Sequence, residues 1–418
     1  MPSTFGSAAT GHRQGEPVPR WPAIALVTVV LCLAGLLSPR FVQHLISLDR
    51  RHGDMRPALY VLQVVVIGAG LYVLIRRDRV NAAFRRVFPS TRYFVMSTAV
   101  VLLCFCFGLG CLECLARILN FPFHVKWTPS ETAIARFDPE VGWSYFPNHT
   151  VTQEFGDDHR KIAMYFDDLG CRVPSTGYHA SHTAPSVLFV GDSFTFGHGV
   201  TYEESLVGRI ASKKDFPFQV VNLGVQAYGT DQALLMLERQ FGKFNTKAVV
   251  LIFTIMQLDR NETYDRRIQY PDGQFLGTKP KFALNADGTV YLQNTPVEFS
   301  HYSYSHLWAA FQVLSFRYGP SRSNRLTRGL IREMQAFTES HGARFVVVDW
   351  YDDDGFPWGL NVDVIRLETH APDGWRSWNI PGDGHPDARA HAFAADYIGG
   401  ELERILAKEH AVGTASTP

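Results

Sequence analysis

The sequence has no excess of charge of either sign. Its 418 residues include 40 Lys+Arg and 40 Asp+Glu, which gives a formal net charge of zero. It also has no basic stripe interleaved with aromatic residues. Neither its overall charge nor a local basic patch therefore indicates a nucleic-acid partner. Internal repeats and low-complexity tracts are absent as well, apart from a tail of small and polar residues after Val412.

Cysteine is scarce outside the first third of the chain. Five of the six cysteines lie in or at the end of long apolar runs, and Cys171 is alone in the remainder, which excludes a disulfide within that part. Cys111 and Cys114 have the CxxC spacing of a redox or zinc motif. With no second pair and an apolar setting, we interpret them as small residues of a membrane helix.

Three long apolar runs are present, at residues 21–39, 57–75 and 93–112. Each is close to the roughly 20 residues needed to cross a bilayer as a helix, so the sequence predicts three transmembrane helices. The alternative for the first run is a cleaved signal peptide, but no small-residue cleavage site follows Leu37. The N-terminal segment and the second loop together contain more arginines than the first loop. This predicts a cytoplasmic N-terminus and an extracytoplasmic chain after about Ile118.

From Ser186 onward, unbroken apolar stretches alternate with amphipathic ones. Strands are expected at residues 187–190, 218–222, 248–253 and 345–349, and helices at residues 326–337, at 393–405 and from Thr230. Apolar strands of this kind belong in a parallel sheet that is covered on both faces. The fold class predicted is a three-layer α/β/α domain, flavodoxin-like in arrangement, preceded by the membrane helices.

The expected organisation has five parts. They are a disordered N-terminus (1–20), a membrane anchor (21–118), a connector forming a short β-rich cap (119–185), the α/β domain (186–410) and a disordered tail (411–418). Helical periodicity stops at about residues 260–304, where a hairpin turning at Asp287-Gly288 is expected. This insertion is expected to be either a lid over the carboxyl edge of the sheet or an inert surface excursion.

The chemistry centres on Gly191-Asp192-Ser193, which follows the first apolar strand. A serine hydroxyl needs a base to take its proton, and Asp383-Gly-His385-Pro before the last helix supplies a histidine and a carboxylate. This combination resembles the SGNH hydrolase superfamily (GDSL-type esterases), in particular its membrane-tethered bacterial type. The resemblance runs from Ser186 to about Ala407.

The resemblance implies a role for each of these residues. Ser193 would be the nucleophile, His385 the general base and Asp383 its orienting partner, although the Asp-x-His spacing departs from the common Asp-x-x-His. The backbone N–H groups of Ser193 and Gly224 would form an oxyanion hole.

The superfamily's third oxyanion donor, an asparagine in Gly-x-Asn-Asp, has no match after Phe253. Gln257 is the nearest amide, and Asn261 lies one helical turn further on. If nothing replaces this donor, its loss should cost roughly 3 to 4 kcal/mol of transition-state stabilisation.

Other candidates receive no catalytic role. His198 would line the pocket or lie in an exposed turn, and the aromatic residues after Asp349 would pack at a strand end. His391 with Asp383 falls short of a metal ligand set, so no metal and no cofactor are expected.

The sequence thus predicts a membrane-anchored, extracytoplasmic serine esterase or deacylase acting on acylated cell-surface or exopolysaccharide glycans. One alternative is an O-acyltransferase that works with a multi-spanning membrane acyltransferase or polysaccharide-assembly partner. Another is a non-catalytic glycan-binding or scaffold subunit, which the missing asparagine motivates.

Overall fold

The structure is a computed structural model. It describes residues 21–36, 56–88, 90–119, 121, 133–269, 276–298, 305–318, 324–352 and 359–415. The expected disorder of residues 1–20 lies outside this part. The chain divides into two compact units, one ending at Cys114 and the other beginning at Leu115.

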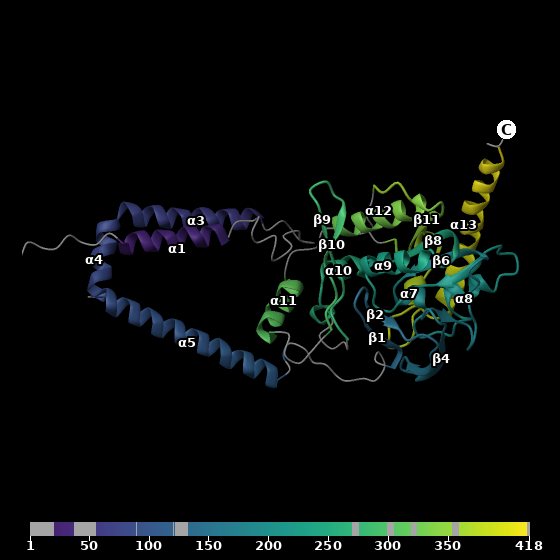
Figure 1. Cartoon of the computed structure of the whole chain (residues 1–418), viewed down its shortest axis with the longest axis horizontal. Helices are drawn as coiled ribbons and strands as arrows, with labels where there is room; N and C mark the ends of the chain where they lie inside the picture. The colour runs from purple at the N-terminus through teal and green to yellow at the C-terminus, as the bar shows by residue number, and fades with distance from the viewer. Residues whose placement is uncertain are drawn as a thin grey trace, which may run out of the picture. The chain divides into compact units, whose positions relative to one another are not determined.

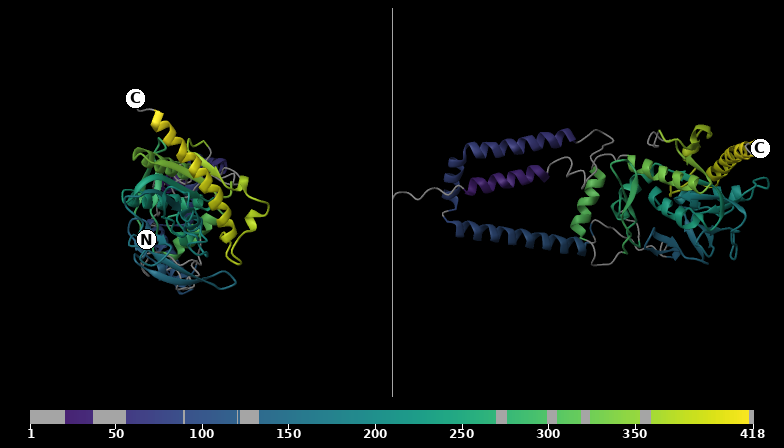
Figure 2. Two further views of the ribbon diagram at one scale, coloured as in Figure 1. Left: turned by 90° about the vertical axis from the view of Figure 1, so that its right-hand side faces the viewer. Right: turned by 45° about the horizontal axis from the view of Figure 1, so that its top comes forward.

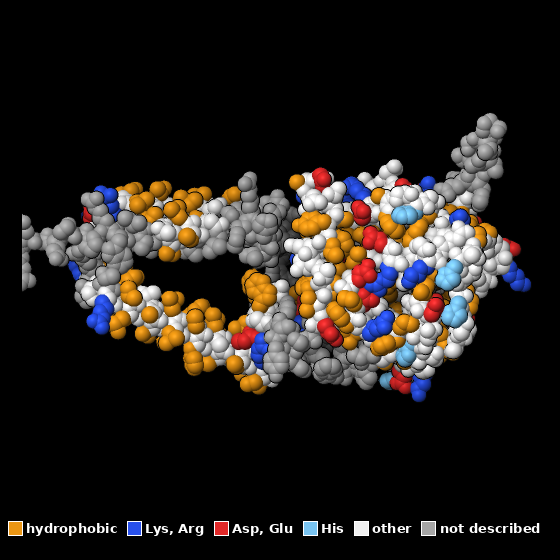
Figure 3. Space-filling model, viewed as in Figure 1, with side chains coloured by type: hydrophobic (Ala, Val, Ile, Leu, Met, Phe, Trp, Pro, Cys, Tyr) orange, Lys and Arg blue, Asp and Glu red, His pale blue; other side chains and the backbone are white. Residues whose placement is uncertain are grey.

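The first unit is helical. Its helices are α1 (Trp21–Leu36), α3 (Arg56–Ile75), α4 (Arg77–Val87) and α5 (Thr91–Ile118), the last of which continues into the second unit. Apolar side chains are exposed along much of α3 and α5, as Figure 3 shows.

The expectation of three membrane-spanning helices is not supported. Among the described residues one helix, Arg92–Ile118, is long and apolar enough to span a membrane. A second span would require the pair Tyr60–Ile75 and Arg77–Phe84, which is bent by 83°. Although α1 is apolar, its 16 residues correspond to about 24 Å, less than the hydrocarbon thickness of a bilayer.

A five-stranded parallel sheet forms the centre of the second unit, in the order β12-β11-β8-β6-β7 (Figure 1). The strands are β6 (Pro185–Gly191), β7 (Gln219–Asn222), β8 (Asn245–Phe253), β11 (Arg344–Asp349) and β12 (Asp363–Arg366). Between them come α7 (Ser193–Phe196), α8 (Leu206–Ala211), α9 (Thr230–Phe241), α10 (Met256–Glu262), α11 (His306–Tyr318) and α12 (Arg325–Ser340), and α13 (Ala388–Ala415) closes the chain. Short 3₁₀ helices occur at Arg266–Ile268, Glu368–His370 and Trp375–Ser377.

Both faces of this sheet are buried, as its unbroken apolar strands predicted. Leu188 and Val190 of β6 point into one core with α9 and α12, while Val187 and Phe189 point into the other with α8 and α13. Figure 2 shows these helices from two further directions. The α/β expectation and its four strands are therefore confirmed.

The strand that the sequence analysis missed is β12. It contains four residues, of which only Ile365 is fully buried, and it pairs with β11 alone at the edge of the sheet. A short edge strand with charged ends carries little periodic signal, because half of its surface faces solvent.

The segment before β6 forms a small β-rich cap. Its strands are β1 (Ala135–Asp138) and β2 (Gly142–Tyr145), which pair antiparallel, and β3 (Thr150–Phe155), β4 (Arg160–Phe166) and β5 (Arg172–Val173), which form a second sheet. Trp143 from the cap packs edge-on against Tyr228, and the Tyr228 hydroxyl donates a hydrogen bond to the Trp143 carbonyl. The cap therefore shares a core with the α9 face of the sheet.

The insertion contains the expected hairpin, β9 (Lys281–Leu284) and β10 (Val290–Asn294), which packs on α12. The segment just before β9 is held against the start of α9, where the buried Lys279 ammonium contacts the Asp231 carboxylate. Whether the insertion acts as a lid stays a prediction.

The last helix, α13, runs to Ala415 and so extends into the segment 411–418, which was expected to be a disordered tail.

Candidate active site

Ser193 lies at the first turn after β6, at the carboxyl edge of the parallel sheet. Gly191 ends the strand with φ of +147°, and a Cβ there would lie 2.4 Å from Thr195 Oγ1 and 2.8 Å from the Ile252 carbonyl oxygen. Asp192 then caps α7, since its Oδ1 accepts a hydrogen bond from the Phe194 N–H at 3.0 Å. The tight turn therefore fixes the backbone of Ser193.

The structure brings together the three residues that the sequence singled out. Ser193 Oγ lies 2.9 Å from Nε2 of His385, close enough to donate a hydrogen bond to it. His385 Nδ1 in turn contacts Asp383 Oδ1. The side chain of Ser193 is almost completely buried and that of His385 is about a quarter exposed. A hydroxyl, an imidazole and a carboxylate in this order can transfer a proton away from the hydroxyl.

Asp383 also has a second histidine partner. Its Oδ2 lies 3.0 Å from Nε2 of His198, and Nδ1 of His198 lies 2.6 Å from the Gln226 side-chain nitrogen. Burial opposes the charge on Asp383, but the hydrogen bonds from His198 and His385 hold the pKa of this carboxyl well below its usual range. No motif in the sequence predicts a catalytic role for His198 or for Gln226.

A buried arginine from the cap holds the nucleophile loop. The Arg172 guanidinium donates hydrogen bonds to the carbonyl oxygens of Phe196, Gly197 and Val200 at 2.9, 2.5 and 2.6 Å. It also lies over the Phe196 ring, 4.7 Å from the centroid. Burial lowers the pKa of Arg172 to about 10, so it remains a cation at neutral pH. The cap therefore braces the loop that carries Ser193 and His198.

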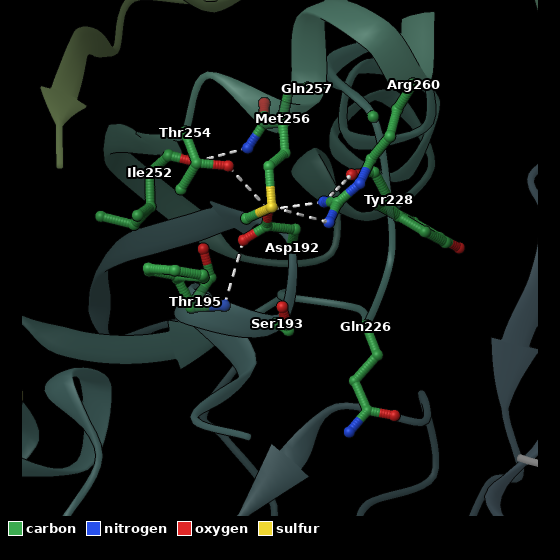
Figure 4. A network of polar contacts seen from close by, with 12 residues as sticks. Asp192, Ser193, Thr195, Gln226, Tyr228, Ile252, Thr254, Met256, Gln257 and Arg260 are labelled. Carbon is green, nitrogen blue, oxygen red and sulfur yellow. Dashed lines mark hydrogen bonds and ion pairs between the residues drawn. The ribbon is translucent and has the colours of Figure 1, made fainter. Parts of the chain in front are cut away.

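Asp192 takes part in a second buried network, shown in Figure 4. Its Oδ2 accepts hydrogen bonds from Thr254 Oγ1 at 3.1 Å and from Arg260 at 2.6 Å. The same Arg260 nitrogen lies 3.0 Å from the Tyr228 carbonyl oxygen, and the Arg260 Nε has no partner among the described residues. The residue before the nucleophile is thus one half of a buried ion pair.

The two amides considered as a third oxyanion donor each donate a hydrogen bond to another group, and this role stays a prediction for both. Gln257 Nε2 donates to the Ile252 carbonyl at 2.9 Å, toward the end of β8 (Figure 4). Asn261 Nδ2 donates to Thr327 Oγ1 at 2.7 Å. Both residues lie on α10, Gln257 in its first turn and Asn261 near its end, and both side chains are fully buried.

Gly224 follows β7 and lies beside α7. A Cβ there would lie 2.5 Å from the Phe196 backbone nitrogen, so this close approach requires glycine. Its N–H donates to the Asn222 side-chain oxygen at 2.9 Å, and the Asn222 amide nitrogen in turn lies 3.1 Å from the Thr195 carbonyl oxygen. The role of Gly224 as an oxyanion donor stays a prediction.

The remaining residues from the sequence analysis are parts of the core. Trp350 is fully buried and packs edge-on against Phe194. His391 is fully buried, with Nδ1 accepting a hydrogen bond from the Leu206 N–H at 3.2 Å, and burial lowers its pKa to about 3.

One group of side chains among the described residues has a spacing that could hold a metal ion. His198, Asp383 and His385 each offer one ligand atom within 4.8 Å of the others. His198 Nε2 and His385 Nδ1 both hydrogen bond to Asp383, so a metal ion held between these three side chains would have to replace both hydrogen bonds. The expected absence of a metal remains a prediction.

The chain matches no family model, and no curated protein matches it. Among solved structures, it is similar to a member of the lipolytic protein G-D-S-L family from Veillonella parvula DSM 2008. The identity is 12%, the coverage is 51% of this chain and 96% of the other, and the TM-score is 0.27. A lipolytic G-D-S-L family protein from Desulfitobacterium hafniense DCB-2 matches at 12% identity over 51% and 97% of the two chains, with a TM-score of 0.26. Both similarities are low, and neither shows a function for this chain.

Proposed function

We propose that this protein is a serine esterase or deacylase in which Ser193 is the nucleophile. The observation that carries the proposal is the continuous contact from Ser193 Oγ to His385 and on to Asp383, at the carboxyl edge of a parallel sheet. Chemistry at this edge is usual in α/β folds. The low pKa of Asp383 keeps the carboxylate charged, as a group that orients a base must be.

The proposed reaction has two steps. Ser193 Oγ attacks the ester carbonyl carbon while His385 Nε2 takes the hydroxyl proton, and the imidazolium then returns this proton to the leaving alcohol as the ester C–O bond breaks. Water attacks the acyl-serine in the second step, giving its proton to His385, and Ser193 regains a proton as the carboxylic acid leaves. Throughout, Asp383 would hold the Nδ1–H of His385 and stabilise its positive charge.

The developing oxyanion would be stabilised by the backbone N–H of Ser193 and by that of Gly224. For Gly224 this requires that the substrate oxygen replace the Asn222 oxygen as acceptor of the hydrogen bond.

We further propose that the enzyme is tethered to a membrane by α5 and faces the extracytoplasmic side. The apolar span Arg92–Ile118 runs into the start of the second unit at Leu115 and supports the tether. Acylated glycans of the cell surface or of an exopolysaccharide are the proposed substrates. They are ester-bearing molecules at that location.

A non-catalytic, glycan-binding role is the second candidate, and one observation favours it. Both amides that could serve as the third oxyanion donor, Gln257 and Asn261, donate to other groups. A site with fewer donors stabilises the transition state less, by roughly 3 to 4 kcal/mol for each one lost.

The test is labelling of the full chain in detergent with a fluorophosphonate probe. We expect labelling of the wild type and none of the Ser193→Ala or His385→Ala variants. Ser205→Ala is a matched control, because Ser205 is also a fully buried serine at the start of a helix but hydrogen bonds to Tyr202 and Gly208 instead. A well-folded wild type that does not react with the probe would refute the esterase proposal and favour the binding subunit.

A further inference from the structure

His198 holds a defined position between the proposed triad and the cap. It follows α7 in the segment Gly197-His198-Gly199, and both glycines have positive φ, +82° and +71°. Its backbone N–H donates to the Ser193 carbonyl at 3.0 Å, so the turn brings His198 back beside the nucleophile. The ring lies 4.1 Å from the His385 ring, measured between centroids.

The hydrogen bonds of His198 specify which ring nitrogen carries the proton. The Gln226 amide N–H can only donate, so Nδ1 of His198, 2.6 Å away, accepts. A neutral ring that accepts at Nδ1 has its proton on Nε2, and this nitrogen lies 3.0 Å from Asp383 Oδ2. His198 therefore donates one hydrogen bond to the carboxylate that also binds His385.

Few groups could alter this state. The charged or titratable side chains acting on His198 are Asp383, His385 and, from the cap, Arg172, while the Phe155 ring closes another side edge-on. Burial lowers the pKa of His198, His385 and Arg172 act in the same direction, and Asp383 opposes them. The net direction keeps the ring neutral at pH 7.

We infer that His198 is a positioning residue for the proposed hydrolysis. It acts through Asp383, in a hydrogen-bonded series that runs from Gln226 through His198 and Asp383 to His385. The inference deepens the proposed function and rests on it. By donating to Oδ2, His198 fixes the carboxylate plane so that Oδ1 faces His385. It also shares the negative charge of the carboxylate, which would otherwise act on His385 alone.

The consequence is a shift in the pH dependence of the rate. In His198→Leu the whole carboxylate charge would act on His385, so the pH dependence of kcat/KM should differ from that of the wild type. Because His198 acts through Asp383, kcat should fall while KM stays unchanged. His198→Gln retains a neutral N–H donor and should restore most of the wild-type profile.

The experiment measures p-nitrophenyl acetate hydrolysis from pH 5 to 9 by the full chain in detergent, with thermal unfolding of each variant. His179→Leu is the control, since it removes another histidine that contacts an aspartate, Asp168, at an exposed position. A folded His198→Leu variant with the wild-type profile would overturn the inference. So would a His198→Gln variant no better than His198→Leu.

A second readout does not depend on activity. In the wild type, ¹⁵N chemical shifts of His198 at pH 7 should show the neutral ring with its proton on Nε2. A proton on Nδ1, or a cationic ring, would overturn the inference. If the wild type neither hydrolyses the ester nor reacts with a fluorophosphonate, the proposed function fails, and the ¹⁵N result still decides whether His198 donates to Asp383.

Discussion

The buried pair of Arg260 and Asp192 gives a quantitative prediction about stability. The Asp192 side chain is fully buried and that of Arg260 is 6% exposed, with 2.6 Å between the paired atoms. In Arg260→Met the carboxylate would retain hydrogen bonds only from Phe194 and Thr254. Removing one partner of a buried ion pair leaves an uncompensated charge, so we expect a loss of about 3 to 5 kcal/mol in the free energy of unfolding.

A second substitution separates this electrostatic effect from the loss of packing. Asp192→Asn in the Arg260→Met background removes the buried charge but keeps an oxygen that can cap α7. The double variant should therefore recover about 2 kcal/mol relative to Arg260→Met. Fluorophosphonate labelling should be weaker in Arg260→Met and should recover in the double variant together with stability, because Asp192 fixes the turn that carries Ser193.

Urea unfolding followed by tryptophan fluorescence measures both values. Arg376→Met is the matched control, because Arg376 pairs with Glu368 at the surface, where the expected loss is at most about 1 kcal/mol. A loss for Arg260→Met no larger than that of the control would refute the reasoning. A double variant less stable than Arg260→Met would also refute it.

Three further predictions concern the loop brace and the response to acid. Arg172→Met should cost at least about 2 kcal/mol and slow fluorophosphonate labelling, and Arg172→Lys should restore little, because one ammonium cannot replace a fork that reaches three carbonyls. The pKa of Asp383 is lowered on folding, so this carboxylate stabilises the fold at neutral pH and does so less as the pH falls below about 4. Asp383→Asn should therefore reduce the free energy of unfolding most at neutral pH. A loss that does not depend on pH in unfolding titrations would contradict this. His391 takes up a proton more readily when unfolded, with a folded pKa of about 3 against 6.5, so the wild type should lose stability as the pH falls from 6.5 toward 3. His391→Gln should flatten that dependence, and an unchanged slope would contradict it.

The main strands and the position of the proposed nucleophile could be predicted from the sequence alone. Strands β6, β8 and β11 each contain an uninterrupted apolar run, and such runs are stable only when both faces of a sheet are covered. The carboxyl ends of parallel strands share one edge, so a serine directly after β6 had to lie there. The Asp383 and His385 pair before the last helix was identified through the family resemblance.

Only the tertiary structure decided which polar groups meet. The sequence placed Gln257 and Asn261 near the site because both follow β8, but α10 directs their amides to Ile252 and Thr327. Conversely, His198 and Asp383 are 185 positions apart, and the turn after α7 brings them within 3.0 Å. Arg172 reaches the nucleophile loop from the cap in the same way. Local periodicity records which face of an element is buried, whereas hydrogen bonds between distant segments depend on how these segments pack, which no single stretch of sequence encodes.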